Sequence, residues 1–182
     1  MFEDHSGHNI AEAFVNVLGF WDLDISKLVA TTTDNGSNFV AAFNSLDWIR
    51  VSCFGHNLDL AINKALDLDR VRRAVKKCCS LVELFSRSWK KTRDLKEKQV
   101  QLGLEVHKLT GDVATRWGST YNMVSRIVEQ QQAICAVLAE DRKDWHRMPS
   151  ENEFSTLESL VEVLKPLSVF TDAFSGENHV TV

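Results

Sequence analysis

Proline and cysteine are scarce in this sequence, and long apolar runs are absent. Its 182 residues include two prolines and four cysteines, and no apolar run approaches the roughly 18–20 residues that a membrane-spanning helix requires. Cys78 and Cys79 are adjacent, so the four cysteines do not resemble a disulfide framework, and we expect free thiols in a reducing compartment. Apolar residues make up 44% of the chain, which predicts a folded protein without a membrane segment.

The charge of the chain is unevenly distributed. The net charge is −4, yet the segment 70–98 holds eleven Lys or Arg residues and three acidic ones and therefore carries +8. The remaining residues accordingly carry −12. A basic segment in an acidic chain can bind a polyanion locally, whereas a solvated helix face has the same composition. Both interpretations stay open from charge alone.

Short strands and helices alternate in the first third of the sequence. The apolar spacing predicts helices over 8–19, 39–46 and 57–66. The β-branched run 27–33 and the run 48–54 predict two strands, and a polar turn follows the first strand. This alternation favours a partial α/β segment with parallel strands over residues 1–66.

Residues 67–182 predict a mostly helical segment. Apolar residues from Val71 to Trp89 recur at the 4-3-4-3-4 spacing of one helix face. The opposite side carries Arg70, Arg73, Lys76 and Lys77. Further helices are expected over 93–102, 119–138 and 154–170, with a loop over 142–150 and an ambiguous stretch with some strand character over 104–113. Pro166 should kink or divide the last helix.

Asp34 is the residue that most strongly suggests chemistry. It belongs to the polar turn Asp34-Asn35-Gly36-Ser37-Asn38, at the end of a predicted strand, where open α/β sheets place ligands. Hard divalent cations prefer carboxylate oxygens, so Mg²⁺ or Mn²⁺ is the expected ligand. The alternative is that Asp34 or Ser37 only caps the helix that follows.

Two further pairs of residues stand at predicted junctions. Cys53 and His56 supply two of the four ligands of a zinc site, and no second pair stands at suitable spacing. We therefore expect His56 to act as a proton donor or phosphate contact instead. Arg116 and Trp117 combine a phosphate-binding guanidinium with an indole, which suits a nucleotide extruded from its stack. The alternative for Trp117 is a core residue before a helix N-cap at Ser119 or Thr120.

Three segments together resemble the transposases of the hAT superfamily, and especially their domesticated relatives with BED-type zinc fingers. These segments are Thr32–Asn38, Cys53–Leu60 and Asp112–Tyr121. Their order and separation are more specific than any one motif, and the resemblance spans most of the chain.

The resemblance implies a ribonuclease H-like core, interrupted by a helical insertion, that cuts and joins DNA with three carboxylates and two Mg²⁺ or Mn²⁺ ions. Asp34 matches the second, metal-binding carboxylate. Cys53 and His56 match a Cys/His motif beside the active site. Trp117, with Arg116, matches a tryptophan that stacks on a flipped base, and the basic helix from Arg70 would lie at the start of the insertion, where it would contact the DNA backbone.

Only one of the three carboxylates implied by the resemblance has a match in these residues. The first Asp would precede the helix 8–19, and the Glu would follow the insertion. We therefore expect an incomplete ribonuclease H-like fold in a fragment of a hAT-type transposase core, or in a transposase-derived nuclear DNA-binding protein. Alone, it should neither catalyse strand transfer nor bind a metal ion tightly. The alternative is a nuclear protein-interaction or transcription-regulatory module without catalysis. DNA and a second copy of the chain are the expected partners.

Overall fold

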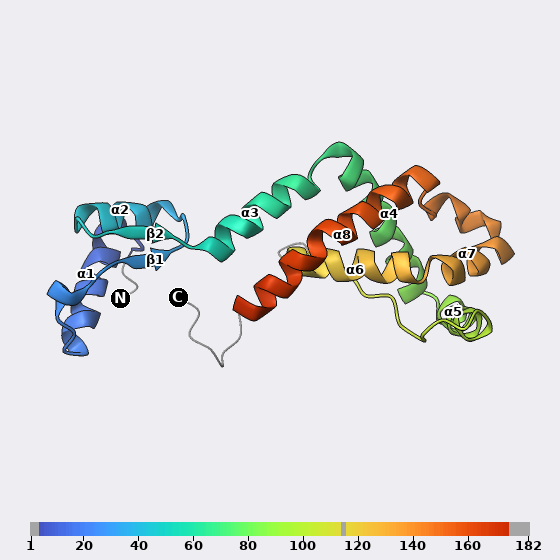
Figure 1. The fold of residues 1–182 in the computed structure, drawn as a ribbon, viewed down its shortest axis with the longest axis horizontal. Coiled ribbons are helices and arrows are strands. Elements are labelled where there is room, and N and C mark those ends of the chain that lie inside the picture. Colours follow the sequence, from blue (N-terminus) through green and yellow to red (C-terminus); the bar gives the residue numbers. More distant parts are fainter. Residues whose placement is uncertain (1–3, 114–115, 175–182) are drawn as a thin grey trace. The chain divides into compact units, whose positions relative to one another are not determined.

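The computed structural model describes residues 4–113 and 116–174. These residues are mostly helical, with two short strands (Figure 1). They form two compact units, Met1–Ala61 (unit 1) and Ile62–Val182 (unit 2). The sequence predicts a boundary between two segments after residue 66. The two compact units of the structure divide after Ala61, inside the helix Phe54–Leu66. Among the described residues, no helix has the length and apolar character needed to span a membrane.

Unit 1 contains both strands and the helices around them. Its elements are α1 (Gly7–Phe20), a 3₁₀ turn (Ile25–Lys27), β1 (Thr31–Thr33), α2 (Ser37–Ser45), β2 (Arg50–Ser52) and the first part of α3 (Phe54–Leu66). The strands pair in parallel, with Thr31 opposite Arg50 and Thr33 opposite Ser52. Since α2 connects them, this is the crossover arrangement that parallel strands require. Both strands are shorter than the runs 27–33 and 48–54 predict.

The core of unit 1 is the contact between α1 and α2. The Phe14 ring lies edge-on to Phe39 and Phe43, with ring centroids 6.5 and 5.0 Å apart. Phe43 is fully buried. Gly7 allows the two helices to approach closely, because a Cβ at this position would lie 2.8 Å from the Cβ of Ala41.

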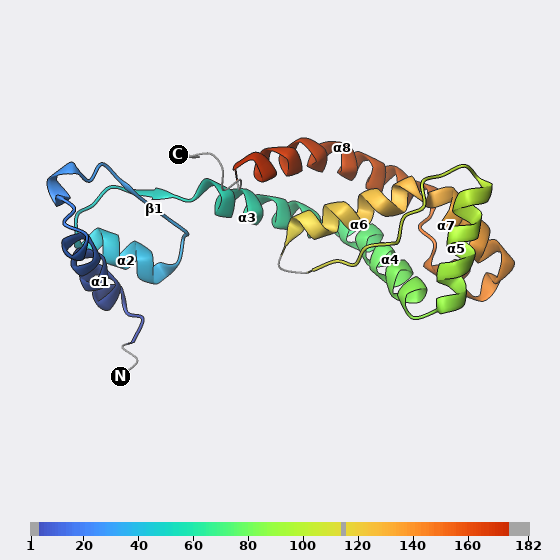
Figure 2. The same ribbon diagram turned by 90° about the horizontal axis from the view of Figure 1, so that it is seen from below.

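Unit 2 is built from helices packed around one apolar cluster. Its further elements are α4 (Asp69–Ser86), α5 (Trp89–Gln101), α6 (Trp117–Glu129), α7 (Gln131–Glu140), a 3₁₀ turn (Arg142–Arg147) and α8 (Glu151–Phe174). Helix α8 packs on α4 and α6, and α5 packs on α7 (Figure 1 and Figure 2). Cys78 and Phe85, which belong to the predicted apolar spacing of α4, are buried in this cluster together with Leu81, whereas Val75 and Val82 of that spacing are partly buried against it.

The single helix expected over 119–138 is wrong, because α6 ends at Glu129 and α7 begins at Gln131. The residue between them, Gln130, is fully buried. Its side chain accepts a hydrogen bond from Gln99 Nε2 (3.0 Å) and donates one to the carbonyl oxygen of Glu105 (3.1 Å). A buried amide needs such partners, and both come from distant parts of the sequence.

Three other local expectations also differ from the structure. Helix α4 ends at Ser86, so Trp89 leaves its apolar face and begins α5 instead. Helix α8 continues through Pro166, so the proline does not divide it; the proline is exposed, where water can hydrate the carbonyl group that loses its donor. The stretch 104–113 contains no strand.

Candidate functional site

Asp34 and Cys53 follow the carboxyl ends of the two parallel strands, and His56 lies in the first turn of α3; we call these three residues the strand-edge site. Cys53 follows β2, and its N–H donates to the carbonyl oxygen of Thr33 at the end of β1 (2.7 Å). Asn35 Nδ2 donates to Asn57 Oδ1 (2.7 Å) and ties the turn after β1 to the first turn of α3. The first two resemblance segments therefore meet in space, as parallel pairing requires.

Asp34 is exposed and held by its own turn. Its Oδ1 accepts a hydrogen bond from the N–H of Gly36 (3.0 Å), and its carbonyl oxygen accepts one from Arg50 Nη1 (3.0 Å). Gly36, not Asp34 or Ser37, is the N-cap of α2. Asp34 thus orders the entry to α2, as an Asx turn does, and keeps an accessible carboxylate.

The strand-edge site does not by itself fit a magnesium ion. Mg²⁺ requires nearly octahedral oxygen ligands, whereas the site offers one carboxylate beside the thiol of Cys53 and the imidazole of His56, both half-buried. Within the described ranges, the residues that bring three potential ligands together are Glu105, His107 and Glu129, in unit 2. Asp34 therefore supplies one ligand at most.

The four predicted DNA-contacting cations of α4 divide into two pairs. Arg70 Nε donates to Thr156 Oγ1 on α8 (2.7 Å), and Lys77 Nζ donates to the carbonyl oxygen of His146 (2.5 Å). These two cations hold α4 against its neighbours. Arg73 and Lys76 are exposed and have no hydrogen-bond or ion-pair partner among the described residues.

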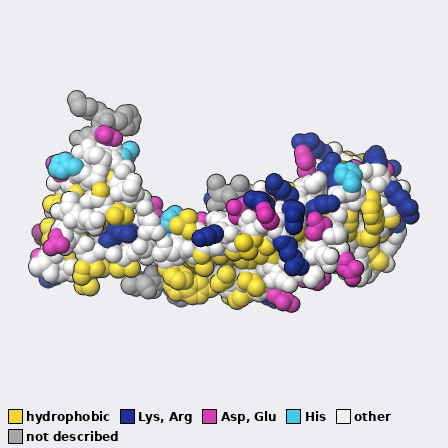
Figure 3. Space-filling model, turned by 90° about the horizontal axis from the view of Figure 1, so that it is seen from above, with side chains coloured by type: hydrophobic (Ala, Val, Ile, Leu, Met, Phe, Trp, Pro, Cys, Tyr) yellow, Lys and Arg dark blue, Asp and Glu magenta, His cyan; other side chains and the backbone are white. Residues whose placement is uncertain are grey.

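The eleven cations of the whole basic segment 70–98 divide in the same way. Five of its cations form ion pairs, namely Arg72, Arg87, Lys91, Arg93 and Lys98. Four are exposed and unpaired within the described part of the chain; we call Arg73, Lys76, Lys90 and Lys96 the free cations. Figure 3 shows Lys and Arg side chains concentrated over unit 2 and interspersed with acidic ones.

The pair Arg116-Trp117 opens α6. Arg116 is the exposed N-cap residue, and Trp117 is only 7% exposed. Ser119 and Thr120, which the sequence offered as N-caps, instead donate to Asp112 Oδ1 (2.8 and 2.9 Å). The indole of Trp117 is therefore buried, in agreement with the alternative that it is a core residue. Its stacking on a DNA base stays a prediction. Thr115, part of the same motif, lies outside the described residues.

Two features of unit 2 are not predicted from the sequence. A cavity lies beside the exposed Trp89, whose position among lysines was the available signal. His107 contacts two carboxylates, Glu129 through Nδ1 (3.0 Å) and Glu105 through Nε2 (3.2 Å). Its two nitrogens therefore face different carboxylates, in contrast to a set of ligands that converges on one metal ion.

The adjacent thiols of α4 are structural. Burial raises the pKa of Cys78 to about 12, and burial also raises the pKa of Cys79. Thiolates are the metal-binding and nucleophilic form of cysteine. Cys78 and Cys79 are therefore poor candidates for either role.

Comparison with known proteins identifies the family. Residues 51–163, more than half of the chain, match the family model described as the ZBED1 RNase-like helical domain. The chain is 25% identical over 175 residues to human "Zinc finger BED domain-containing protein 4". This alignment covers 96% of the chain and 15% of that relative. The chain is 23% identical over 194 residues to "Putative AC transposase" of Zea mays, covering 97% of this chain and 24% of that protein.

The chain thus spans less than a quarter of the length of either relative. Both relatives agree with the resemblance to hAT transposases and to proteins with BED-type zinc fingers, which is thereby confirmed. This chain belongs to the ZBED1 RNase-like helical domain family.

Proposed function

We propose that this chain is a DNA-contacting domain of a transposase-derived nuclear protein and that its 182 residues do not cleave DNA on their own. The free cations on α4 and α5 are the observation that carries this proposal. These four side chains are exposed and do not belong to the buried faces of their helices, so phosphate groups can reach them.

The division of the α4 cations into bonded and free residues determines how the chain is expected to bind DNA. Arg70 and Lys77 already bond to unit 2 itself, so Arg73 and Lys76 are the residues of α4 that would meet DNA. Few phosphate contacts give weak, salt-sensitive and sequence-independent binding. The name of the maize relative, a transposase, agrees with a DNA partner.

The proposal for the strand-edge site is a partial one. Asp34 would contribute one carboxylate to a ribonuclease H-like metal centre, with His56 beside it as a proton donor or phosphate contact. Two-metal phosphoryl transfer needs several carboxylates around the ions. Among the described residues of unit 1, no three potential metal ligands come within 4.8 Å of one another, which supports inactivity of these residues alone.

The first experiment measures duplex DNA binding over a salt series by fluorescence anisotropy. The double variant Arg73→Ala/Lys76→Ala should reduce the slope of log K against log salt by roughly 2, because each lost phosphate contact removes about 0.9. The matched control Arg87→Ala/Lys143→Ala removes the same charge from residues that are already ion-paired and should change the slope less. Equal slopes for both variants would contradict the proposal.

The second experiment tests catalysis by incubating the chain with nicked and intact plasmid in Mn²⁺. No Mn²⁺-dependent cleavage or joining is expected. Cleavage that disappears in Asp34→Asn would overturn the proposed inactivity and assign the metal site to these residues.

A protein-interaction module without catalysis is the second candidate function. Exposed Val163 and Val169 on α8 favour it, because apolar surface of this kind is typical of contacts with other proteins. Under this alternative the chain would show no measurable affinity for duplex DNA even at low salt.

A further inference from the structure

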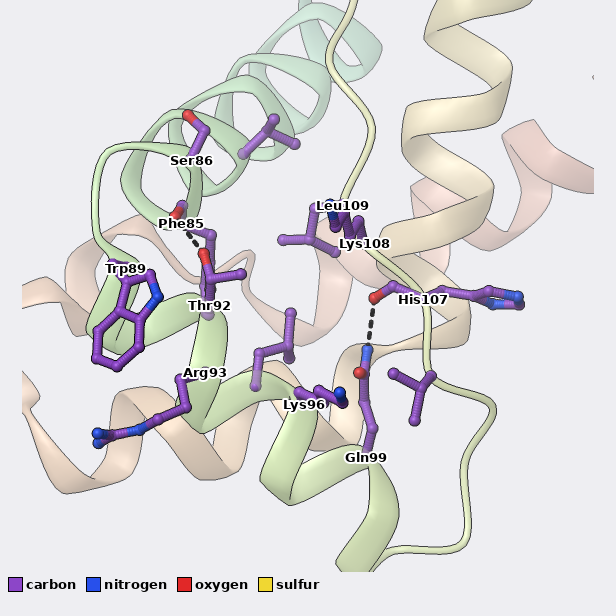
Figure 4. A pocket seen from close by; sticks show the side chains of 13 residues that line it. Phe85, Ser86, Trp89, Thr92, Arg93, Lys96, Gln99, His107, Lys108 and Leu109 are labelled. Carbon is purple, nitrogen blue, oxygen red and sulfur yellow. Dashed lines mark hydrogen bonds between the residues drawn. The ribbon is translucent and has the colours of Figure 1, made fainter.

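A cavity of about 610 Å³ lies in unit 2 between the end of α4, helix α5 and the segment 106–109 (Figure 4). Its apolar lining includes Phe85, Leu95 and Leu109, and Trp89, Lys96 and Lys108 also line it. This volume falls within the range of 300–1,000 Å³ that is typical of small-ligand sites.

Hydrogen bonds fix the walls of this cavity. The buried Gln99 donates through Nε2 to the carbonyl oxygen of His107 (2.8 Å) and holds the segment 106–109 against α5. The His107 ring points away from the cavity and pairs with Glu129 (Figure 4). Thr92 Oγ1 donates to the carbonyl oxygen of Phe85 (2.8 Å) and fixes the turn from α4 to α5. The cavity is therefore preformed rather than a loose gap between mobile side chains.

The side chains around the cavity combine an open aromatic ring with positive charge. Trp89 is 75% exposed, which is unusual for an indole next to an apolar lining. The Arg93 guanidinium lies over this ring, 5.3 Å from its centroid, and its charge is balanced by Asp94 and Glu97.

The net positive charge of the cavity therefore comes from its two lysines. Lys96 and Lys108 are exposed and have no ion-pair or hydrogen-bond partner among the described residues. An apolar interior, an open indole and two unpaired ammonium groups suit a flat, largely apolar ring system that carries an anionic group.

We propose that this cavity binds one nucleotide, with its base against Trp89 and its phosphate at Lys96 and Lys108. The same chemistry has two sources, a free nucleotide or an unpaired nucleotide at the end of a DNA strand. The second source rests on the proposed function of DNA contact. Trp117, the other tryptophan predicted to stack on a base, is buried and exposes much less of its ring than Trp89.

The test compares three probes: a blunt DNA duplex, the same duplex with a five-nucleotide 3′ overhang, and dAMP. Trp89→Ala should weaken binding of the overhang duplex or of dAMP by roughly 5- to 150-fold, the range expected for one stacked base. Lys96→Ala/Lys108→Ala should weaken the same probe, and Trp89→Phe should retain most of the binding. Trp21→Ala, which removes another exposed indole, is the matched control and should have no effect.

The three probes separate the sources and the two proposals. A loss confined to the overhang duplex assigns the cavity to a DNA strand, and a loss for dAMP assigns it to a free nucleotide. Binding of dAMP that depends on Trp89, without any binding of blunt duplex, would support the cavity and contradict the proposed function. Equal affinity of wild type and Trp89→Ala for every probe, or no binding of dAMP and no gain from the overhang, would overturn the nucleotide proposal.

Discussion

The two units of this protein bury very different numbers of apolar side chains. Of the twenty buried apolar residues in the described part of the chain, three belong to unit 1 (Ala11, Ala42 and Phe43) and seventeen to unit 2. Yet unit 1 carries Asp34, Cys53 and His56, the residues that most strongly suggest chemistry. The comparison shows that the candidate catalytic edge is built on the weaker core and the free cations on the stronger one.

The strands of unit 1 contribute little to its burial. Val29, Ile49 and Val51, within or beside the strands, are 83%, 67% and 49% exposed. A two-stranded sheet is only marginally stable without packing on a face. The contact of α1 with α2 therefore carries most of the stability of unit 1, and a single residue of that contact should matter greatly.

The largest expected effect is that of Phe43→Ala in unit 1. Removing a fully buried phenylalanine that contacts Phe14 and Trp48 should lower the free energy of unfolding of this unit by about 3–5 kcal/mol. Because so few other residues are buried there, we expect unit 1 to unfold while unit 2 stays folded. Hydrogen exchange followed by mass spectrometry would show faster exchange in α1, α2 and both strands.

The control for this change is Val29→Ala, which truncates an exposed residue of the same unit and should alter exchange very little. If Phe43→Ala accelerated exchange in α4 and α6 as much as in α2, the two units would unfold together. The contrast between a weak and a strong unit would then fail.

The next largest effect is expected for Leu138→Ala in unit 2. Leu138 is fully buried on α7 within the main apolar cluster, and its truncation should cost about 2–5 kcal/mol. Unlike unit 1, unit 2 has many other buried residues, so it should remain folded with a lower urea midpoint. Circular dichroism at 222 nm would follow the transition, and the exposed Val163→Ala should shift it by no more than about 0.5 kcal/mol. Complete loss of helicity in Leu138→Ala would place unit 2 close to the stability of unit 1.

The sequence predicts the faces of the helices better than their ends. The apolar spacing from Val71 to Trp89 predicts one buried helix face, and the structure buries Cys78 and Phe85 of this set. The break at Gln130 depends on hydrogen bonds with Gln99 and Glu105, which lie 25 or more residues away. No local pattern contains that information, so a continuous helix was the natural expectation.

The same limit applies to the candidate sites. Parallel strands bring Asp34 and Cys53 to one edge, which their positions after two strand-like runs already indicate. By contrast, Arg70 bonds to a residue 86 positions away, and Lys77 to one 69 positions away. A helix face of four cations is therefore uniform in sequence, although of these four only Arg73 and Lys76 are unpaired in the described structure.

The smallest expected effects compare one helix start in each unit. Ser150 precedes α8, and its N–H and Oγ both donate to Glu153 Oε2 (2.7 and 2.9 Å), while Ser150 Oγ accepts from the Glu153 N–H (3.4 Å). This reciprocal arrangement is a capping box. The N-cap of α1, Ser6, accepts from the Asn9 N–H (3.3 Å), and the residue at the third helical position is an uncharged Asn. Ser150→Ala and Ser6→Ala should each cost about 1 kcal/mol at neutral pH.

Acid should separate these two helix starts. The pKa of Glu153 lies below its ordinary value, first because its carboxylate accepts the Ser150 N–H, then because of the Ser150 hydroxyl, Lys77 and Arg73, with burial opposing the shift. A carboxylate with a lowered pKa stabilises the folded state above its ordinary value of 4.5, and this stabilisation disappears as pH falls through the lowered folded pKa. Urea unfolding of Glu153→Gln should therefore depend less on pH between 5 and 3 than that of wild type, whereas the cost of Ser6→Ala should stay constant. Parallel pH profiles for wild type and Glu153→Gln would contradict this, because the start of α8 would then gain nothing from its charge and would be no stronger than the start of α1.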